Sequence, residues 1–229
     1  MRYNNIVKAD FKKRINRFVA ECDIKGENIK VHVKNTGRCK ELLKENAFVY
    51  LQKSDNPNRK TAYDLISVYK GKELFNMDSQ VPNRLVKEAI ENGNIKLEGF
   101  DEDMIIKPET KYGNSRLDFF IQNKNRKAYV EVKGVTLEEN GIAMFPDAPT
   151  VRGIKHIRDL IDALKEGNDA YLIFVIQFRG SKYFTPNPSH KDFIEALKDA
   201  KNSGVNILAF ECFVSMDEVK VVHEIEVKL

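Results

Sequence analysis

Two neighbouring segments decide the fold of the second half of the chain: Ser115-Arg116-Leu117-Asp118-Phe119-Phe120-Ile121 and Tyr129-Val130-Glu131-Val132-Lys133-Gly134-Val135. Apolar and polar residues alternate in both segments. This predicts two half-buried β-strands, because successive side chains of a strand point to opposite faces. Asp118 points away from the apolar face of the first strand, and Glu131 and Lys133 do the same in the second. If the strands pair, Asp118 lies beside Glu131 and Lys133.

An acid followed on the next strand by Glu-x-Lys is the core of the PD-(D/E)xK nuclease pattern. Two carboxylates at one edge of a sheet repel each other unless a cation lies between them, and oxygen ligands suit Mg²⁺ or Mn²⁺. A neighbouring lysine can orient, or help to deprotonate, the water that attacks phosphorus. We therefore predict Asp118 and Glu131 as metal ligands and catalytic residues, and Lys133 as a further catalytic residue. The alternative is a surface ion pair on a solvent-facing strand.

Around these strands the hydrophobic period alternates between that of strands and that of helices, which predicts an α/β domain with a mixed sheet. Further strands are expected at 103–106, 171–178 and 206–214, and helices at 151–165 and 191–202.

One more helix, 83–93, is expected before the sheet, with Asn83 as its N-cap and Gly93 as its C-terminal stop. We place a domain boundary at its start, which divides the chain into residues 1–84 and 85–229. Glu88 lies on this helix, where nucleases of this pattern often carry an additional metal ligand or water-orienting acid. An exposed helical residue is an equally good interpretation of Glu88.

The first third of the chain alternates short strand-like runs with polar turns. Strands are expected at 16–22, 29–33, 48–51 and 62–69, with a hairpin turn at Gly26 and one short helical stretch at 39–43. This spacing predicts a small OB-like β-barrel, whose usual ligand is an oligonucleotide. A barrel that only packs against its neighbour is the alternative.

Cations gather where helix 151–165 begins. Positive side chains oppose the helix dipole at an N-terminus, whereas a bound anion reverses the balance. With the exposed N–H groups of the first turn they predict a phosphate site, and we assign it to Arg152, Lys155 and His156, with Arg158 nearby. A structural histidine is the alternative for His156.

The predicted barrel carries its own set of polar residues that can bind phosphate: Arg14, Arg17, His32, Asn35, Thr36, Arg38, Arg59 and Lys60. Phe18 and Tyr63 are candidates for stacking on nucleic-acid bases, although aromatic residues in such barrels more often belong to the core.

The chain of 229 residues carries a formal net charge of only +4, with 38 Lys and Arg against 34 Asp and Glu. Residues 1–84 hold 18 of the basic and 10 of the acidic residues, so a basic barrel precedes a mildly acidic domain. That asymmetry favours a partner that is a polyanion, and DNA is the nucleic acid that we expect. Three widely spaced cysteines predict neither a disulfide framework nor a zinc site. No apolar run is long enough to cross a membrane, so we expect a soluble, cytoplasmic protein.

Several segments together resemble the sugar fermentation stimulation protein A family: Asn35-Thr-Gly-Arg38, Asn56-Pro-Asn-Arg-Lys60, Pro82-Asn-Arg-Leu85, Gly113-Asn-Ser-Arg-Leu-Asp118, Glu131-Val-Lys-Gly-Val-Thr136 and Phe145-Pro-Asp-Ala-Pro-Thr-Val-Arg-Gly-Ile-Lys-His156. The resemblance implies an OB-like domain followed by a restriction-endonuclease-like PD-(D/E)xK domain, with DNA binding. It also implies an association with regulation of sugar (maltose) metabolism genes, which these residues do not explain. By position it makes Asp118, Glu131 and Lys133 catalytic, together with Glu88. From the resemblance we expect methionine at the position where this chain has Cys39.

Three functions compete at this stage. The first is a Mg²⁺- or Mn²⁺-dependent nuclease in which the barrel captures DNA and the α/β domain cuts it. The second is a DNA-binding transcriptional regulator that keeps a nuclease fold as a scaffold, and the third is an adaptor for RNA or protein. The complete set of two acids and a lysine favours the nuclease, because a pure binder gains nothing from carboxylates near phosphates.

Overall fold

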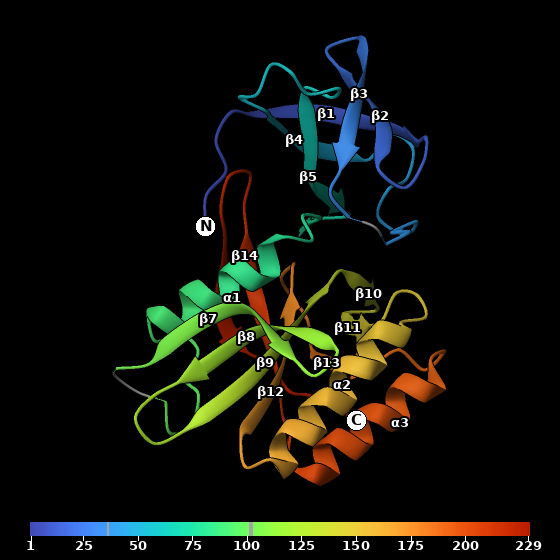
Figure 1. The fold of residues 1–229 in the computed structure, drawn as a ribbon. Coiled ribbons are helices and arrows are strands. Elements are labelled where there is room, and N and C mark those ends of the chain that lie inside the picture. Colours follow the sequence, from blue (N-terminus) through green and yellow to red (C-terminus); the bar gives the residue numbers. More distant parts are fainter. Residues whose placement is uncertain (36, 101–102) are drawn as a thin grey trace.

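The first part of the chain folds as a closed barrel (Figure 1). In the computed structural model, which describes residues 1–35, 37–100 and 103–229, the strands lie in the order β3-β2-β1-β4-β5-β6 and a parallel pairing of β3 with β5 closes the barrel. Alternate residues such as Val31, Val49 and Leu65 fill its interior. The predicted barrel is therefore confirmed, with strands β1 (Ile6–Arg14), β2 (Val19–Ile24), β3 (Glu27–Val33), β4 (Phe48–Lys53), β5 (Tyr63–Lys70) and β6 (Glu73–Asn76).

Three parts of the barrel differ from the sequence prediction. Strands β1 and β6 were not expected, although Val7, Ala9 and Phe11 of β1 alternate with charged residues in the same pattern that predicted β8 and β9. The stretch 39–43 forms turns rather than a helix, since Cys39 has a φ of 46° and only Leu42 and Leu43 donate back to its carbonyl group. The hairpin at Gly26 forms as predicted, with a φ of 90° that glycine adopts without strain.

The second domain is a mixed sheet with helices on both faces (Figure 1). Its strand order is β15-β14-β12-β9-β8-β7, in which β9, β12 and β14 are parallel. The elements are α1 (Val81–Glu91), β7 (Ile105–Tyr112), β8 (Ser115–Gln122), β9 (Lys127–Val135), α2 (Val151–Lys165), β12 (Asp169–Ile176), α3 (Lys191–Ser203), β14 (Asn206–Val214) and β15 (Val219–Glu224). A small side sheet holds β10 (Leu137–Glu139), β11 (Ile142–Phe145) and β13 (Tyr183–Pro186).

Helix α1 begins two residues earlier than the sequence predicted, and Gln80 rather than Asn83 is its N-cap. Pro82 starts the helix because its fixed φ suits the first turn. The predicted boundary at Arg84 therefore falls inside α1, which packs on β9 and β15.

Two polar contacts, one buried and one half-buried, join the barrel to the second domain. Gln177 Nε2 donates to Asn76 Oδ1 at 2.9 Å, and Lys70 Nζ donates to Glu138 Oε2 at 2.5 Å. A Cβ at Gly134 would lie 2.6 Å from Gln177 Oε1, so this junction requires glycine. These contacts fix where the barrel stands relative to β9. In the described part of the chain no helix is long and apolar enough to cross a membrane.

Candidate functional site

The carboxylate of Asp118 lies where strands β8 and β9 separate. Their ladder runs from Gln122 opposite Lys127 to Phe119 opposite Val130, and the same register continues to Asp118 opposite Glu131. At that point Asp118 Oδ2 accepts a hydrogen bond from the backbone N–H of Val132 at 2.8 Å. The Asp118 carboxylate thus replaces a backbone carbonyl group of β8 as the hydrogen-bond acceptor for Val132. Asp118 and Glu131, the two carboxylates that the sequence predicted to be neighbours, lie together.

Asp118 has a second partner that the sequence did not reveal. Asn83 Nδ2, on α1, donates to Asp118 Oδ1 at 2.8 Å. Burial, followed by the neighbouring charge of Glu131, raises the pKa of Asp118, although the two hydrogen bonds and Lys133 work against that rise. Without a cation, burial and the nearby charge of Glu131 therefore make the ionised form of Asp118 energetically unfavourable.

Glu131 is 2% exposed, and its two oxygens differ in their surroundings. Oε1 accepts hydrogen bonds from Lys133 Nζ and from His156 Nδ1, the latter at 2.5 Å. Oε2 is buried and has no hydrogen-bond partner among the described residues. Burial alone would raise the pKa of Glu131, but His156 and Lys133 outweigh it and hold the pKa below its usual value. Glu131 is therefore an anion with one oxygen anchored and the other free.

This donor set fits a hard divalent cation. A buried, unpaired carboxylate oxygen is costly unless a cation or donor satisfies it, and Glu131 Oε2 is such an atom beside a second carboxylate. The described residues contain no group of three or more His, Cys, Asp or Glu side chains that could hold a metal. Any ion on Asp118 and Glu131 would complete its coordination with water, backbone oxygens or a substrate phosphate, as Mg²⁺ commonly does.

Helix α2 supplies the cations that the sequence singled out, but it uses them in two ways. His156 is only 4% exposed and points at Glu131 rather than into solvent. Arg152 Nε donates to His156 Nε2 at 3.4 Å, so His156 positions Glu131 and its own ring is positioned by Arg152. Arg152 and Lys155 are exposed on the first two turns, where Lys155 Nζ also contacts Ser115 Oγ and Asp159 Oδ2, the latter at 3.4 Å.

Glu88 does not join the carboxylate pair. It is exposed, and its carboxylate binds the N-terminal amine of Met1 at 3.1 Å. Asn83 is the α1 residue that reaches Asp118. From the sequence, Asn83 was predicted as an N-cap, because asparagine after proline is typical of a helix start. Its contact with Asp118 was therefore missed.

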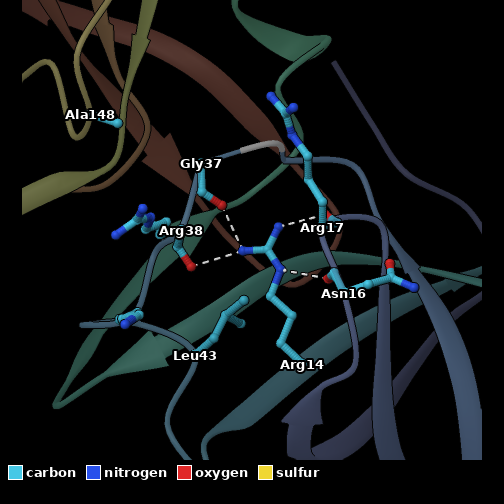
Figure 2. Close-up of a pocket in the computed structure, with 8 residues that line it drawn as sticks. Arg14, Asn16, Arg17, Gly37, Arg38, Leu43 and Ala148 are labelled. Atoms are coloured by element: carbon cyan, nitrogen blue, oxygen red, sulfur yellow. Dashed lines mark hydrogen bonds between the residues drawn. The ribbon is translucent and has the colours of Figure 1, made fainter.

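The sequence predicted that Arg14 and Arg59 of the barrel bind phosphate, but the guanidinium groups of both residues are occupied by contacts within the protein. The five N–H groups of Arg14 donate to five backbone carbonyl groups at 2.6–3.2 Å. Figure 2 shows the bonds to Asn16, Arg17, Gly37 and Arg38, and the fifth acceptor is Asn35. The guanidinium group of Arg59 binds both oxygens of the buried Asp64, which His32 also contacts.

The other predicted barrel residues are placed differently. Arg17, Arg38 and Lys60 are exposed, whereas Asn35 is half-buried and its Oδ1 accepts from the N–H of Gly37. Tyr63 packs against the core, and Phe18 is 51% exposed. Thr36 lies outside the described residues.

Replacing Asp118 with asparagine is expected to stabilise the metal-free protein. The raised pKa of Asp118 means that the folded state favours its protonated form, so its contribution to stability is present below about pH 4 and is lost as pH rises through the folded pKa. The substitution removes that loss, and the Asn83 amide can turn to accept from the new amide. We expect a Tm gain of about 2–4 °C at pH 7 for each 1 kcal/mol recovered.

Thermal unfolding in EDTA, measured from pH 7 down to about pH 4, tests this expectation, with the difference between the Asp118→Asn variant and the wild type narrowing as the pH falls. Asp199→Asn on the exposed side of α3 is the matched control. A variant that is less stable than the wild type at pH 7 would show that the charge of Asp118 is satisfied without a cation.

Comparisons with known proteins agree with this fold and extend over the whole chain. Residues 80–218 match the family description "Sugar fermentation stimulation protein RE domain", and residues 13–77 match "SfsA N-terminal OB domain". A protein of Clostridium beijerinckii named sugar fermentation stimulation protein homolog is 54% identical over 100% of both chains. A homolog of the same name from Ruminiclostridium cellulolyticum is 52% identical over 100% of both chains.

A solved structure is also similar. "The structure of Pyrococcus Furiosus SfsA in complex with Ca2+" has a TM-score of 0.89 and 29% sequence identity, covering 100% of this chain and 98% of that chain. The predicted fold class, an OB barrel followed by a mixed-sheet domain, is thereby confirmed. The chain belongs to the sugar fermentation stimulation protein family.

Proposed function

We propose that this protein is a metal-dependent nuclease that hydrolyses phosphodiester bonds of DNA in its second domain. The observation that carries the proposal is the buried, unpartnered Oε2 of Glu131 beside Asp118, with Lys133 attached to the other oxygen of the same carboxylate. Asp118 and Glu131 would hold Mg²⁺ or Mn²⁺. When bound, such an ion polarises the scissile phosphate and makes water a stronger acid.

The residues of the chain have distinct tasks in this reaction. Lys133 lies at the rim of the carboxylate pair, where its ammonium group can orient the attacking water. His156 holds Glu131 through the same oxygen, Oε1, and stays buried. Arg152 and Lys155 are exposed beside them and supply positive charge for the phosphate group. Attack by water forms a new P–O bond and breaks a bridging P–O bond, and the departing oxygen takes up a proton.

Three further observations support the proposal. The similar structure from Pyrococcus furiosus is described as a complex with Ca²⁺, a hard cation that prefers oxygen ligands. The barrel has an excess of 18 basic over 10 acidic residues, whereas acidic residues predominate in the second domain, and this excess suits the capture of a polyanion. The three cysteines are unpaired and buried, which suits a reducing compartment, and we place the activity in the cytoplasm.

Replacing Lys133 with methionine is expected to slow cleavage by about 100-fold or more, the usual contribution of a positioned acid–base group. The assay uses purified full-length protein with single-stranded DNA, duplex DNA and RNA in Mg²⁺ or Mn²⁺, and EDTA should stop the reaction. Lys127→Met is the matched control, because Lys127 is exposed at the start of the same strand, away from the carboxylates. It should cleave at the wild-type rate.

The alternative function, a DNA-binding regulator, predicts a different result in the same assay. Tight DNA binding that needs no metal, with no cleavage of any of the three substrates, would contradict the nuclease and favour a DNA-binding regulator on a nuclease scaffold. Equal rates for Lys133→Met and the wild type would contradict the task assigned to Lys133.

A further inference from the structure

A groove runs between the barrel and the second domain toward the carboxylate pair. Its outer part is a pocket of about 610 Å³ and its inner part a pocket of about 210 Å³, and the two share Gly37 and Ala148 (Figure 2). The inner pocket reaches Gly134, which directly follows Lys133, and Thr150, the N-cap of α2. The groove therefore leads from the surface of the barrel to Gly134 and Thr150, the residues that adjoin Lys133 in β9 and begin α2.

Cationic side chains line the barrel side of the outer pocket. Arg17, Arg38 and Lys40 are exposed there, and none of them forms an ion pair with another residue in the described part of the chain. Ala148 is the lining residue contributed by the second domain (Figure 2). Positive charge that is not neutralised internally favours an anionic ligand that lies along this wall.

Hydrogen bonds from Arg14 hold the backbone of this wall in place in the absence of a ligand. Its guanidinium group binds the carbonyl oxygens of Asn35, Gly37 and Arg38, the last two of which are drawn in Figure 2, so these oxygens do not face a ligand. The same group binds the carbonyl oxygens of Asn16 and Arg17 in the β1–β2 turn. One half-buried cation thus holds both barrel segments that form the outer pocket.

An exposed aromatic ring stands beside the pocket. Phe18 is 51% exposed, and the Arg17 guanidinium lies 5.8 Å from the centre of its ring. Asn16 Oδ1 accepts from the N–H groups of Phe18 and Val19 at 2.9 and 3.0 Å, which fixes the turn that presents the ring. A rigid turn with an exposed ring and an adjacent cation can stack an unpaired base at low entropic cost.

We propose that Arg17, Phe18, Arg38 and Lys40 form the mouth of a channel for single-stranded DNA, which leads one strand to the carboxylate pair. Duplex DNA covers both faces of each base with its neighbours and offers Phe18 nothing to stack on except at its ends. The outer and inner pockets together have room for a few nucleotides at most, which suits one strand of DNA rather than two. The destination of the strand rests on the proposed function, whereas its binding at the mouth does not.

Fluorescence anisotropy in EDTA tests the channel without any cleavage. The probes are a labelled oligothymidylate of about 16 nucleotides, the upper site size of an OB domain, a blunt hairpin duplex, and oligouridylate of the same length. Phe18→Ala should weaken oligothymidylate binding by about 10- to 100-fold, the value of one base stacked on an aromatic ring. Ile15→Ala is the matched control, because Ile15 is 44% exposed in the same turn but has no ring on which a base can stack, and it should bind within about twofold of the wild type.

Charge is tested separately. Arg17→Met and Arg38→Met should each reduce the slope of log affinity against log salt by about 0.7, the value for one phosphate contact on a single strand. Unchanged oligothymidylate binding by Phe18→Ala, or a duplex that binds as tightly as the single strand, would overturn the proposal. Tighter binding of oligouridylate than of oligothymidylate would assign the channel to RNA instead.

Different results would contradict the nuclease proposal and the channel proposal. A protein that binds oligothymidylate through Phe18 but cuts nothing in Mg²⁺ or Mn²⁺ contradicts the nuclease and leaves the channel standing. A protein that cuts DNA at equal rates with and without Phe18, and binds single strands equally, contradicts the channel alone. Thermal unfolding of each variant confirms that these exposed substitutions leave the fold intact.

Discussion

Replacing Glu131 with glutamine is expected to lower the rate of DNA cleavage by about 1,000-fold or more. The amide keeps an oxygen that can accept from Lys133 and His156, so the side chain stays in place. It replaces the free oxygen Oε2 with an NH₂ group, which cannot bind a cation. The substitution therefore removes the charge that holds the metal while it preserves the shape of the site.

Single-turnover cleavage and thermal unfolding with added Ca²⁺ measure this effect by two routes. Ca²⁺ should raise the Tm of the wild type, since a ligand that binds only the folded state stabilises it, and should leave the Tm of Glu131→Gln unchanged. Glu91→Gln, an exposed substitution on α1, should behave as the wild type in both measurements. A Glu131→Gln variant that cleaves within tenfold of the wild type would show that the chemistry occurs elsewhere.

Replacing Arg14 with methionine is expected to lower the free energy of unfolding by about 2–4 kcal/mol, because hydrogen bonds from charged donors contribute about 1.5–3 kcal/mol each and these are partly exposed. The five carbonyl groups that Arg14 binds belong to the β1–β2 turn and to the segment that follows β3. Methionine fills similar volume and offers no donor. Both segments then lose the group that holds them together.

Urea denaturation of the variant and of the wild type gives this difference directly. Arg17→Met is the control, since Arg17 is exposed in the same turn, and it should stay within about 0.5 kcal/mol of the wild type. Equal stabilities of Arg14→Met and the wild type would mean that solvent replaces the five hydrogen bonds at no cost. In that case the walls of the outer pocket would not depend on Arg14.

The elements that the sequence predicted well are those in which burial follows the local period. Strands β8 and β9 alternate apolar and polar residues, and α2 keeps its apolar residues on one face. In such elements the residues that carry chemistry stand out because they interrupt an apolar face or occupy the other one. Asp118, Glu131 and Lys133 were identified in this way, and the register of the two strands brought them together.

The elements that it missed depend on contacts between distant residues. Asn83 reads as an N-cap from its neighbours, yet its partner Asp118 is 35 residues away. His156 and Arg14 read as phosphate ligands because they are cations in basic segments, yet one is buried against Glu131 and the other is saturated by carbonyl groups. The local sequence contains nothing about which acceptor a long side chain will reach.

The sequence by itself determined the two domains, their order, the asymmetry of charge and the pair of carboxylates with its lysine, since each is encoded by local period and composition. Only the tertiary structure decided which of these groups are free to act. It buried His156, anchored one oxygen of Glu131 and left the other without a partner. It also turned Arg14 inward and left Arg17 and Phe18 at the surface. The physical reason is that hydrogen-bond saturation and desolvation are properties of the packed environment, to which residues remote in sequence contribute.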